Sequence, residues 1–431
     1  MALTGQPTTL AAWLAYVESL HPRSIAMGLD RVREVHARLE AGLACPVITV
    51  GGTNGKGSTC AFLDAMLRAA GYRVGVYSSP HLTRYNERVR IDGREATDAE
   101  LIAAFEAVEA ARIAPEAGGQ PTPLTFFEFG TLAALWLFAR AHLDALVLEV
   151  GLGGRLDAVN LVDADVAVVT SVDLDHQDYL GTTREAIGRE KAGIFRSGRP
   201  AICGETDPPG SILDHATAIG APLFVRGRDY GFVDERVQWR YHGPGGNRYG
   251  LPAPALRGAH QLTNAATALA ALGLLAERLP VSGGAIREGL VSVTLSGRFQ
   301  VLPGRPAVVL DVAHNPHAAR VLASALATMG YYRQTCAVVG MLADKDIAGV
   351  AATLRPIIDV WHVAPLPGPR GASAEELAAA LVAAGVRSDS IHVFASVPEA
   401  FAAARGRSTD ADRIAVFGSF LTVAAALATL G

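Results

Sequence analysis

Several things are scarce in this 431-residue sequence, and each scarcity narrows what the chain can be. Only four residues are cysteines, and no two of them form a CxxC pair, so neither a disulfide framework nor a zinc site is indicated. Charged residues make up 19% of the chain, and the formal net charge is −4. A nucleic-acid binder would show a basic face, so we expect no nucleic-acid partner.

Long apolar runs are also missing. No uncharged stretch reaches the roughly 20 residues that a membrane-spanning helix needs. The N-terminal residues lack the basic segment and apolar run of a secretory signal. We therefore expect no membrane association, and the scattered cysteines indicate the reducing cytoplasm. No heptad repeat indicates an obligate oligomer, so we expect a monomer.

What the chain does contain is a regular alternation of apolar strands and helices. Half of the residues are hydrophobic, and the length predicts two domains. Residues 1–296 should form a domain with a parallel sheet and a small antiparallel β insertion at 223–256, and residues 297–431 a second, Rossmann-like α/β domain. The strands expected are 47–50, 73–77, 145–150, 166–172, 307–312, 336–340, 360–364 and 414–417. A capping box Thr182-x-x-Glu185 predicts a helix to about residue 195, and another helix is expected over 264–279.

The motif with the clearest chemistry is Gly51-Gly52-Thr53-Asn54-Gly55-Lys56-Gly57-Ser58-Thr59, between a predicted strand and a predicted helix. Glycines let backbone N–H groups converge on phosphate oxygens at a helix N-terminus. Lys56 can reach the β- and γ-phosphates, and Ser58 or Thr59 can offer a hydroxyl to Mg²⁺. Gly57 separates the lysine from the hydroxyls, which departs from the usual pattern. The alternative is a Gly-rich turn with an incidental lysine.

This loop resembles the phosphate loop of the Mur ligase superfamily. The chain is similar to its folate branch, the folylpolyglutamate and dihydrofolate synthases, from about residue 10 to the C-terminus. The supporting segments are SSPHL (78–82), NERVRI (86–91), LTFFEFGTLAALW (124–136), LEVGLGGRLDAVN (148–160), TSVDLDHQDYLG (170–181), IGREKAGIFR (187–196), GRFQ (297–300) and DVAHNPHA (311–318). The resemblance implies a P-loop Mur-ligase-type central domain and an ATP-dependent amide ligase.

Metal binding is indicated first by Glu149, near the carboxyl end of a predicted buried strand, where open α/β sheets place their chemistry. The residues alone favour a polar loop residue over a metal ligand for His176, and they allow Lys191 to be a helical lysine paired with a neighbouring acid. The resemblance implies that Ser79, Glu149 and His176 bind Mg²⁺, with two sites. It also implies that Lys191 carries a carbamate derived from CO₂, whose oxygens help to hold metal.

The resemblance gives nucleotide contacts as well. Asn264 could simply cap a helix, but its family role is to contact ATP together with the loop residues Thr53, Asn54, Gly55, Lys56, Gly57 and Ser58. Arg298 is expected at phosphate and Asp311 at ribose. His314 is expected in the cleft as a catalytic-site residue without a fixed role, beside Lys56 and Lys191.

Three segments match the pterin-binding surface of the bifunctional bacterial enzymes. Aromatic rings can sandwich a flat pterin, although Phe126 or Phe127 could also be ordinary core. Relatives often carry an acid at the place of Ala26. The matching residues are Ala26, Met27, Gly28, Leu29, Thr125, Phe126, Phe127, Glu128, Leu156, Asp157 and Ala158.

The implied reaction activates the carboxylate of dihydropteroate, or of a reduced folate, as an acyl phosphate that the amine of L-glutamate then attacks. A monofunctional folylpolyglutamate synthase is the alternative within the branch. A cell-wall Mur ligase would need a further N-terminal domain, for which the fifty residues before the loop leave no room. A P-loop kinase or transport ATPase would not need the second α/β domain. A nucleotide-gated binding module would show no turnover.

Overall fold

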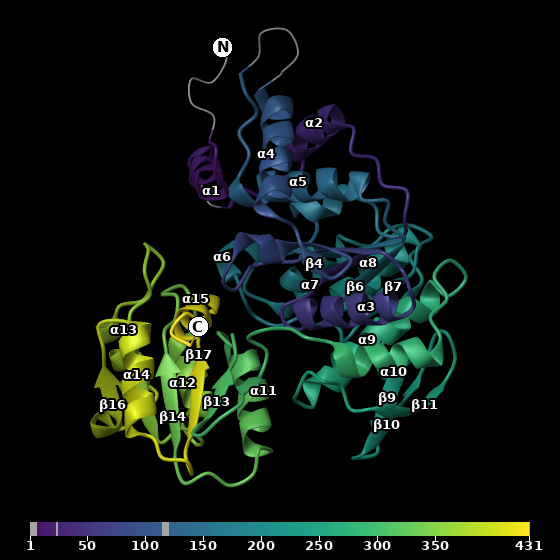
Figure 1. Ribbon diagram of the computed structural model, residues 1–431. Helices are drawn as coiled ribbons and strands as arrows, with labels where there is room; N and C mark the ends of the chain where they lie inside the picture. The colour runs from purple at the N-terminus through teal and green to yellow at the C-terminus, as the bar shows by residue number, and fades with distance from the viewer. Residues whose placement is uncertain (1–6, 23–24, 114–119, 431) are drawn as a thin grey trace. The chain divides into compact units, whose positions relative to one another are not determined.

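The computed structural model describes residues 7–22, 25–113 and 120–430 (Figure 1). The chain divides into two compact units. Unit 1 comprises Met1–Ala253 and Thr263–Val293, and unit 2 comprises Pro254–Leu262 and Thr294–Gly431. Both units combine helices with parallel strands, which confirms the predicted α/β class.

The core of unit 1 is an eight-stranded sheet in the order β4-β3-β2-β5-β1-β6-β7-β8. The six strands β2, β5, β1, β6, β7 and β8 run parallel to one another, and the β3–β4 hairpin adds two antiparallel strands at the β2 edge. Their bounds are β1 Val47–Gly51, β2 Val74–Tyr77, β3 Val89–Ile91, β4 Arg94–Glu95, β5 Ala145–Glu149, β6 Val166–Val169, β7 Ala201–Cys203 and β8 Leu223–Val225. Because parallel strands end at one edge, the loops after β1, β2, β5 and β6 gather there.

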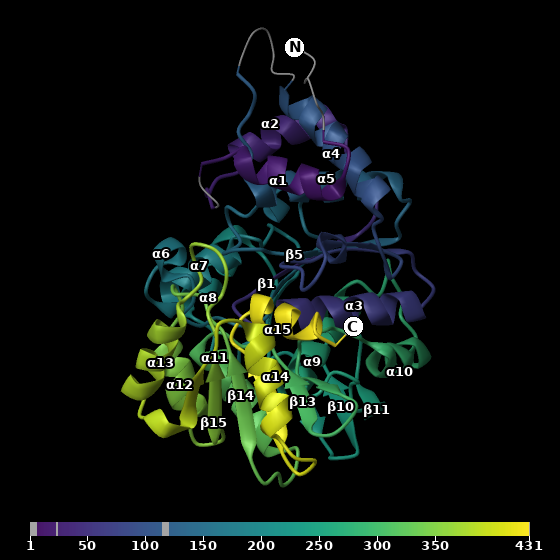
Figure 2. The same ribbon diagram turned by 60° about the vertical axis from the view of Figure 1, so that its left-hand side comes forward.

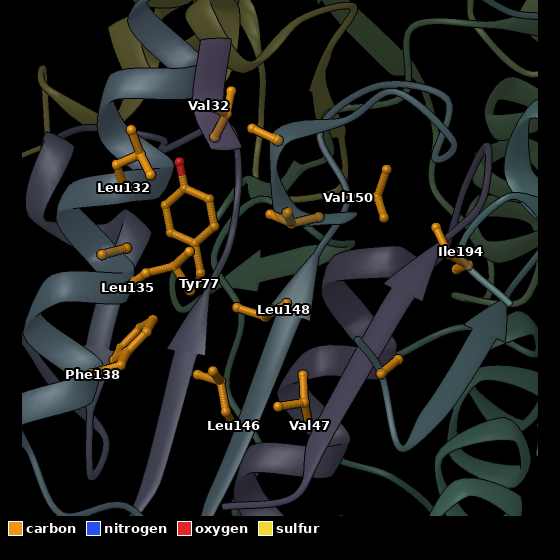
Figure 3. Close-up of a cluster of buried hydrophobic side chains, with 14 of the residues drawn as sticks. Val32, Val47, Tyr77, Leu132, Leu135, Phe138, Leu146, Leu148, Val150 and Ile194 are labelled. Atoms are coloured by element: carbon orange, nitrogen blue, oxygen red, sulfur yellow. The ribbon is translucent and has the colours of Figure 1, made fainter. Parts of the chain in front are cut away.

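Helices cover both faces of this sheet, with α3 on one face and α5 on the other (Figures 1 and 2). Leu132, Leu135 and Phe138 of α5 pack over strand residues such as Tyr77 and Leu148 (Figure 3). All of these side chains are buried, and each fully buried large apolar side chain contributes about 1.5–3 kcal/mol. This packing holds rigid the strands that carry the site.

Several helices of unit 1 begin after a residue whose side chain caps a free backbone N–H group, among them α1, α5, α7 and α10. In α5, the Thr125 hydroxyl accepts from the Glu128 N–H and the Glu128 carboxylate accepts from the Thr125 N–H. The bounds are α1 Leu10–Ser19, α2 Asp30–Leu39, α3 Lys56–Ala69, η1 Tyr85–Arg88, α4 Asp98–Ile113, α5 Phe126–Arg140, η3 Ala158–Leu161, α6 Gln177–Leu180, α7 Arg184–Ala192, α8 Gly210–Ile219, α9 His260–Leu274 and α10 Gly283–Ser292.

The predicted capping box at Thr182 is wrong by one residue. Thr183 is the N-cap of α7, and its hydroxyl accepts from the Ala186 N–H at 3.2 Å. The Glu185 carboxylate instead accepts from the backbone N–H groups of Gly210 and Ser211, at the start of α8. A partner 25 residues away therefore takes the side chain that a local pattern assigned to the cap.

The predicted β insertion is confirmed in part. Strands β9 Gly231–Asp234, β10 Gln238–His242 and β11 Arg248–Pro252 form an antiparallel sheet in the order β11-β10-β9. The segment that opens the predicted insertion, β8, instead extends the large parallel sheet beside β7. The following helix, α9, begins at His260 and not at residue 264, so Asn264 lies inside the helix and is not its cap.

Unit 2 is a six-stranded sheet in the order β12-β13-β17-β14-β15-β16, parallel except for β12, with helices packed against it. All four strands predicted here are present. The bounds are β12 Gln300–Leu302, β13 Ala307–Leu310, β14 Thr335–Val339, β15 Val360–Val363, β16 Ile391–Val393, β17 Arg413–Phe417, α11 Pro316–Ala327, α12 Ile347–Leu354, α13 Ala374–Ala383, η4 Ser388–Ser390, α14 Val397–Arg407 and α15 Phe420–Leu427. Among the helices described, none has the length and hydropathy of a membrane-spanning segment.

Candidate active site

The phosphate loop joins β1 to α3, and the segment after β6 holds it in place. Thr53 donates its backbone N–H to the Ser171 carbonyl at 2.8 Å, and the Asn54 N–H bonds the Ser171 hydroxyl at 2.9 Å. The Thr170 hydroxyl donates to the Asn54 carbonyl at 2.6 Å. Because β1 and β6 are neighbours in the sheet, these two loops meet side by side. These three hydrogen bonds therefore fix the conformation of the loop.

Two glycines of the loop are required by contacts. A Cβ on Gly52 would lie 1.9 Å from the Thr170 hydroxyl oxygen, and one on Gly55 would lie 2.6 Å from the Asn264 side-chain oxygen. Both residues also have positive φ angles, +145° and +86°. Asn264 thus faces the phosphate loop from inside α9, which agrees with a nucleotide-side position.

Lys56 is the first residue of α3, and its amine stays at the loop. The Nζ donates to the Gly52 carbonyl at 2.9 Å and to the Thr53 carbonyl at 3.2 Å. Gly57 and Ser58 continue the first helical turn, where backbone N–H groups have no helical acceptor. A lysine at a helix N-terminus lined by glycines can hold a polyphosphate.

Ser79 and Glu149 meet at the carboxyl edge of the sheet. Glu149 ends β5 and is buried, and Ser79 follows β2, the parallel neighbour of β5. The Ser79 backbone N–H donates to the Glu149 carboxylate at 3.2 Å. A buried carboxylate and a serine, brought together by this bond, are residue types with the oxygen ligands that suit Mg²⁺.

Lys191 of α7 is almost fully buried, with 3% of its surface exposed. Burial, and after it the charge of Lys56, lower the pKa of the Lys191 amine to about 7, against the opposing effect of Asp175 and Asp157. This amine is therefore much less basic than an ordinary lysine. A neutral amine is nucleophilic toward CO₂, whereas an ammonium is not.

His176 follows β6 in a left-handed backbone conformation with φ of +51°. Its backbone N–H donates to the Asp175 carboxylate at 2.9 Å, and its Nε2 lies 4.0 Å from the same oxygen. Within the described ranges, no three His, Cys, Asp or Glu side chains gather as a ready-made metal cage. Two of the four predicted ligands, Ser79 and a modified Lys191, are not among these residue types.

The three predicted pterin segments come together in unit 1. They precede α2, open α5 and precede η3, and these three elements contact one another pairwise. Arg31 bridges two of the segments: one Nη donates to the Ala26 carbonyl at 2.8 Å and to the Glu128 carboxylate at 2.6 Å. Met27 lies 3.8 Å from the position of a Cβ on Gly153, in the loop before the third segment.

The side chains of these segments divide into apolar and polar groups. A Cβ on Gly151 would lie 2.6 Å from the Phe127 ring, which shows how closely the ring covers that backbone. Asp157 accepts from the backbone N–H groups of Leu152, at 2.8 Å, and Val159, at 3.0 Å. Burial raises the pKa of Asp157 to about 7, so this carboxyl can also exist protonated near neutral pH.

The predicted residues of unit 2 follow or flank β13. Asp311 accepts from the backbone N–H groups of Phe299 and Ala313, both at 2.8 Å. The Arg298 guanidinium lies over the Phe420 ring at 4.9 Å, and the His314 Nδ1 lies 2.8 Å from the Val312 carbonyl. Burial raises the pKa of Asp311, while the charge of Arg298 opposes this.

Sequence reasoning missed several residues that shape the site. Arg31 is the bridge between two substrate segments, and Thr170 and Ser171 support the phosphate loop. Arg88 lies buried beside Phe126 and His81. Thr170, Ser171 and Arg88 lie in segments that carry the resemblance, TSVDLDHQDYLG and NERVRI, but nothing local indicated their roles.

Comparisons with known proteins agree with this geometry. Two family models match the chain: "Mur ligase middle domain" over residues 50–272 and "Mur ligase, glutamate ligase domain" over residues 297–420. The dihydrofolate synthase/folylpolyglutamate synthase of Escherichia coli K12 is 50% identical over 416 residues, which cover 96% of this chain and 94% of that protein. The protein of the same name from Haemophilus influenzae is 42% identical, with 96% of each chain covered.

Solved structures match along nearly the whole chain as well. Escherichia coli FolC in complex with DHPP and ADP has a TM-score of 0.92 at 49% identity, and 99% of each chain is covered. A bifunctional folylpolyglutamate synthase/dihydrofolate synthase with Mn, AMPPNP and L-glutamate bound has a TM-score of 0.89 at 50% identity, and 98% of each chain is covered. The predicted resemblance is confirmed, and the chain belongs to the Mur ligase family, in its folate branch.

Proposed function

We propose that this chain is an ATP- and Mg²⁺-dependent amide ligase that adds L-glutamate to dihydropteroate and to reduced folates. One observation carries the proposal: three neighbouring strands bring the candidate site residues to one edge of one sheet. The phosphate loop with Lys56 follows β1, Glu149 ends β5, and Ser79, which donates its N–H to Glu149, follows β2. Kinases and transport ATPases also use phosphate loops. The match to a glutamate ligase domain favours amide formation over phosphate transfer to another acceptor. So do the solved structures of relatives, whose ligands include ADP, AMPPNP and L-glutamate.

In the first step, the substrate carboxylate attacks the γ-phosphate of ATP, a P–O bond forms, and ADP leaves. Lys56 and the backbone N–H groups of the loop hold the phosphates and neutralise charge as it moves to the β-phosphate. Asn264, Arg298 and Asp311 are proposed nucleotide contacts. Residues 26–29, 125–128 and 156–158 are proposed to fix the pterin, and so the carboxylate that reacts.

In the second step, the glutamate amine attacks the acyl phosphate carbon and phosphate leaves. Mg²⁺, when bound by Ser79, Glu149 and His176, would supply positive charge next to the phosphates.

We propose that Lys191 becomes a carbamate: its neutral amine adds to CO₂, a C–N bond forms, and a proton is released. The low pKa of Lys191 supports this proposal, because the amine is half neutral near pH 7.

We further propose that residues 1–296 bind ATP and pterin, that residues 297–431 are the glutamate-ligase domain, and that His314 is a catalytic-site residue. The family model of the glutamate ligase domain begins at residue 297, which supports this division. The monomeric state and the cytoplasmic location stay predictions. All four cysteines are free thiols in the structure, which suits a reducing compartment.

The decisive assay is phosphate release that depends on glutamate. Purified protein with MgATP should release phosphate only when L-glutamate and either dihydropteroate or tetrahydrofolate are both present. Lys56→Ala should lower that rate at least about a hundredfold, because a charge-stabilising donor is lost, with an unchanged circular dichroism spectrum. Phosphate release without glutamate would favour a kinase or ATPase. Turnover of tetrahydrofolate alone would leave a monofunctional folylpolyglutamate synthase.

A further inference from the structure

Arg88 is a buried arginine that the reaction described above does not use. It is the last residue of η1, immediately before β3, and only 9% of its surface is exposed. Its Nε donates to the Nδ1 of His81 at 2.8 Å. The guanidinium carbon lies 5.3 Å from the centre of the Tyr85 ring and 5.5 Å from that of Phe126.

These neighbours do not balance the charge of Arg88. A guanidinium cannot lose its proton in a protein, so the Nδ1 of His81 accepts and carries no proton itself. Two aromatic faces attract the cation but do not neutralise it. In the part of the chain that the structure describes, no carboxylate forms an ion pair with Arg88. Buried cations are normally paired, so this one indicates a place where an anion binds.

The backbone fixes where that place is. The carbonyl of Arg88 accepts from the Ser78 N–H at 2.9 Å, so the Arg88 backbone lies beside Ser78, which follows β2 and precedes Ser79. The side chain turns from there toward Phe126, in the proposed pterin segment at the start of α5. The backbone of Arg88 is thus held next to the residue that precedes Ser79, a proposed metal ligand, while its guanidinium lies at Phe126, a proposed pterin contact.

Two kinds of anion could reach this edge of the sheet, phosphate and carboxylate. The phosphate loop follows β1, and β5 lies between β1 and β2, so the two strand ends are about 10 Å apart. The polyphosphate has its own cradle there, headed by Lys56. A cation flanked by Tyr85 and Phe126 instead fits an aryl carboxylate, whose ring the aromatic side chains can cover.

We propose that Arg88 binds the carboxylate of the acceptor substrate and holds it for attack on ATP. The proposal rests on the proposed function, because it takes the aryl carboxylate of dihydropteroate as the ligand. Arg88 would then discriminate acids from otherwise identical neutral compounds. His81 would fix the guanidinium, since its Nδ1 holds the Nε.

The test compares dihydropteroate with its carboxamide, which has the same rings but no charge. Dissociation constants for both are measured by titration with ADP and Mg²⁺ present. The wild-type chain should bind the acid at least about tenfold more tightly than the amide, as expected for a charge-assisted hydrogen bond. Arg88→Gln should weaken binding of the acid about 10–100-fold and that of the amide less than about threefold.

Two further variants separate ligand binding from folding. Arg88→Lys keeps the positive charge and should retain most of the preference for the acid. Arg90→Gln is the matched control, because Arg90 belongs to the same segment but lies 3.8 Å from Asp64 of α3. It should leave the ratio of acid to amide binding unchanged.

Arg88→Gln overturns the proposal if it weakens acid and amide by the same factor, because the arginine would then be only a packing element. An unchanged acid preference in Arg88→Gln would overturn it as well. A wild-type chain that binds neither compound would overturn the proposed function, and the role of Arg88 with it.

Discussion

Arg31 and Glu128, 97 residues apart in the sequence, form an ion pair with 2.6 Å between Nη2 and Oε1. Only 5% of the Glu128 side chain and 27% of that of Arg31 are exposed. The same Nη also holds the Ala26 carbonyl, while the other Glu128 oxygen caps α5. One pair thus connects the loop before α2 to the start of α5.

Loss of this pair should loosen the pterin site. Arg31→Gln is expected to lower the free energy of unfolding by about 2 kcal/mol, because the Glu128 carboxylate loses a charged donor in a buried place. It should also raise the KM for dihydropteroate about tenfold and leave that for ATP unchanged. Arg33→Gln is the control, since Arg33 pairs at 3.5 Å with a fully exposed Asp30 and should change stability by less than about 0.5 kcal/mol. Equal effects of the two substitutions would contradict the account.

Alanine substitutions at Gly52 and Gly71 distinguish the effect of a steric clash from that of backbone strain. Both have positive φ, but a Cβ would meet the Thr170 oxygen at 1.9 Å in Gly52 and nothing within 4 Å in Gly71. Gly71→Ala should destabilise the protein by about 1 kcal/mol through strain alone. Gly52→Ala should additionally weaken ATP binding by at least about tenfold, because the phosphate loop must shift away from Thr170. Urea unfolding and nucleotide titration measure the two effects, and wild-type ATP affinity in Gly52→Ala would count against the loop geometry.

The carbamate on Lys191 has a pH dependence of definite sign. Below its pKa of about 7 the amine is an ammonium and cannot add to CO₂, so carbamate should increase as the pH rises through 7 at constant dissolved CO₂. An ordinary lysine, with a pKa near 10.4, would require far more alkaline solution. Carbon-13 NMR of protein in labelled bicarbonate should show a carbamate signal that is missing in Lys191→Gln. A signal that persists in that variant belongs to another amine.

The ionised Asp412 carboxylate contributes to the free energy of unfolding of unit 2, and this contribution is lost at low pH. Both carboxylate oxygens accept from Arg333, at 2.9 and 2.7 Å, and one also accepts from Thr409. Arg333 foremost lowers the pKa of Asp412 to about 2, below the value near 3.9 in an unfolded chain. A carboxyl with a lowered pKa stabilises the fold above about pH 4, and this contribution is lost as the pH falls toward 2. Denaturant curves from pH 5 to 2.5 should show a steeper loss in wild type than in Asp412→Asn, and parallel losses would exclude this role.

Local sequence patterns predicted the parts of the fold that local physics decides. The apolar run of residues 47–50 became β1, and the Gly-rich segment after it became the phosphate loop. Burial on both faces of a parallel sheet leaves few alternatives for such a run. The position of Glu149 at the end of β5 followed from the same argument.

Partners distant in the sequence decided what the patterns missed. Glu185 serves the start of α8 instead of its own helix, so the cap moved to Thr183. α9 begins four residues before Asn264, which places that side chain against Gly55. Arg31 and Arg88 have no local signature at all, because their neighbours come from α5 and from the segment after β2.

Activation of the substrate carboxylate by attack on ATP leaves a mark in the phosphate that is released, and oxygen-18 transfer detects it. Dihydropteroate labelled with oxygen-18 in its carboxylate is turned over with MgATP and L-glutamate, and the released phosphate is analysed by mass spectrometry. The account predicts one carboxylate oxygen in each phosphate, because the C–O bond breaks when the amine displaces phosphate from the acyl carbon. Unlabelled phosphate from labelled dihydropteroate would contradict it.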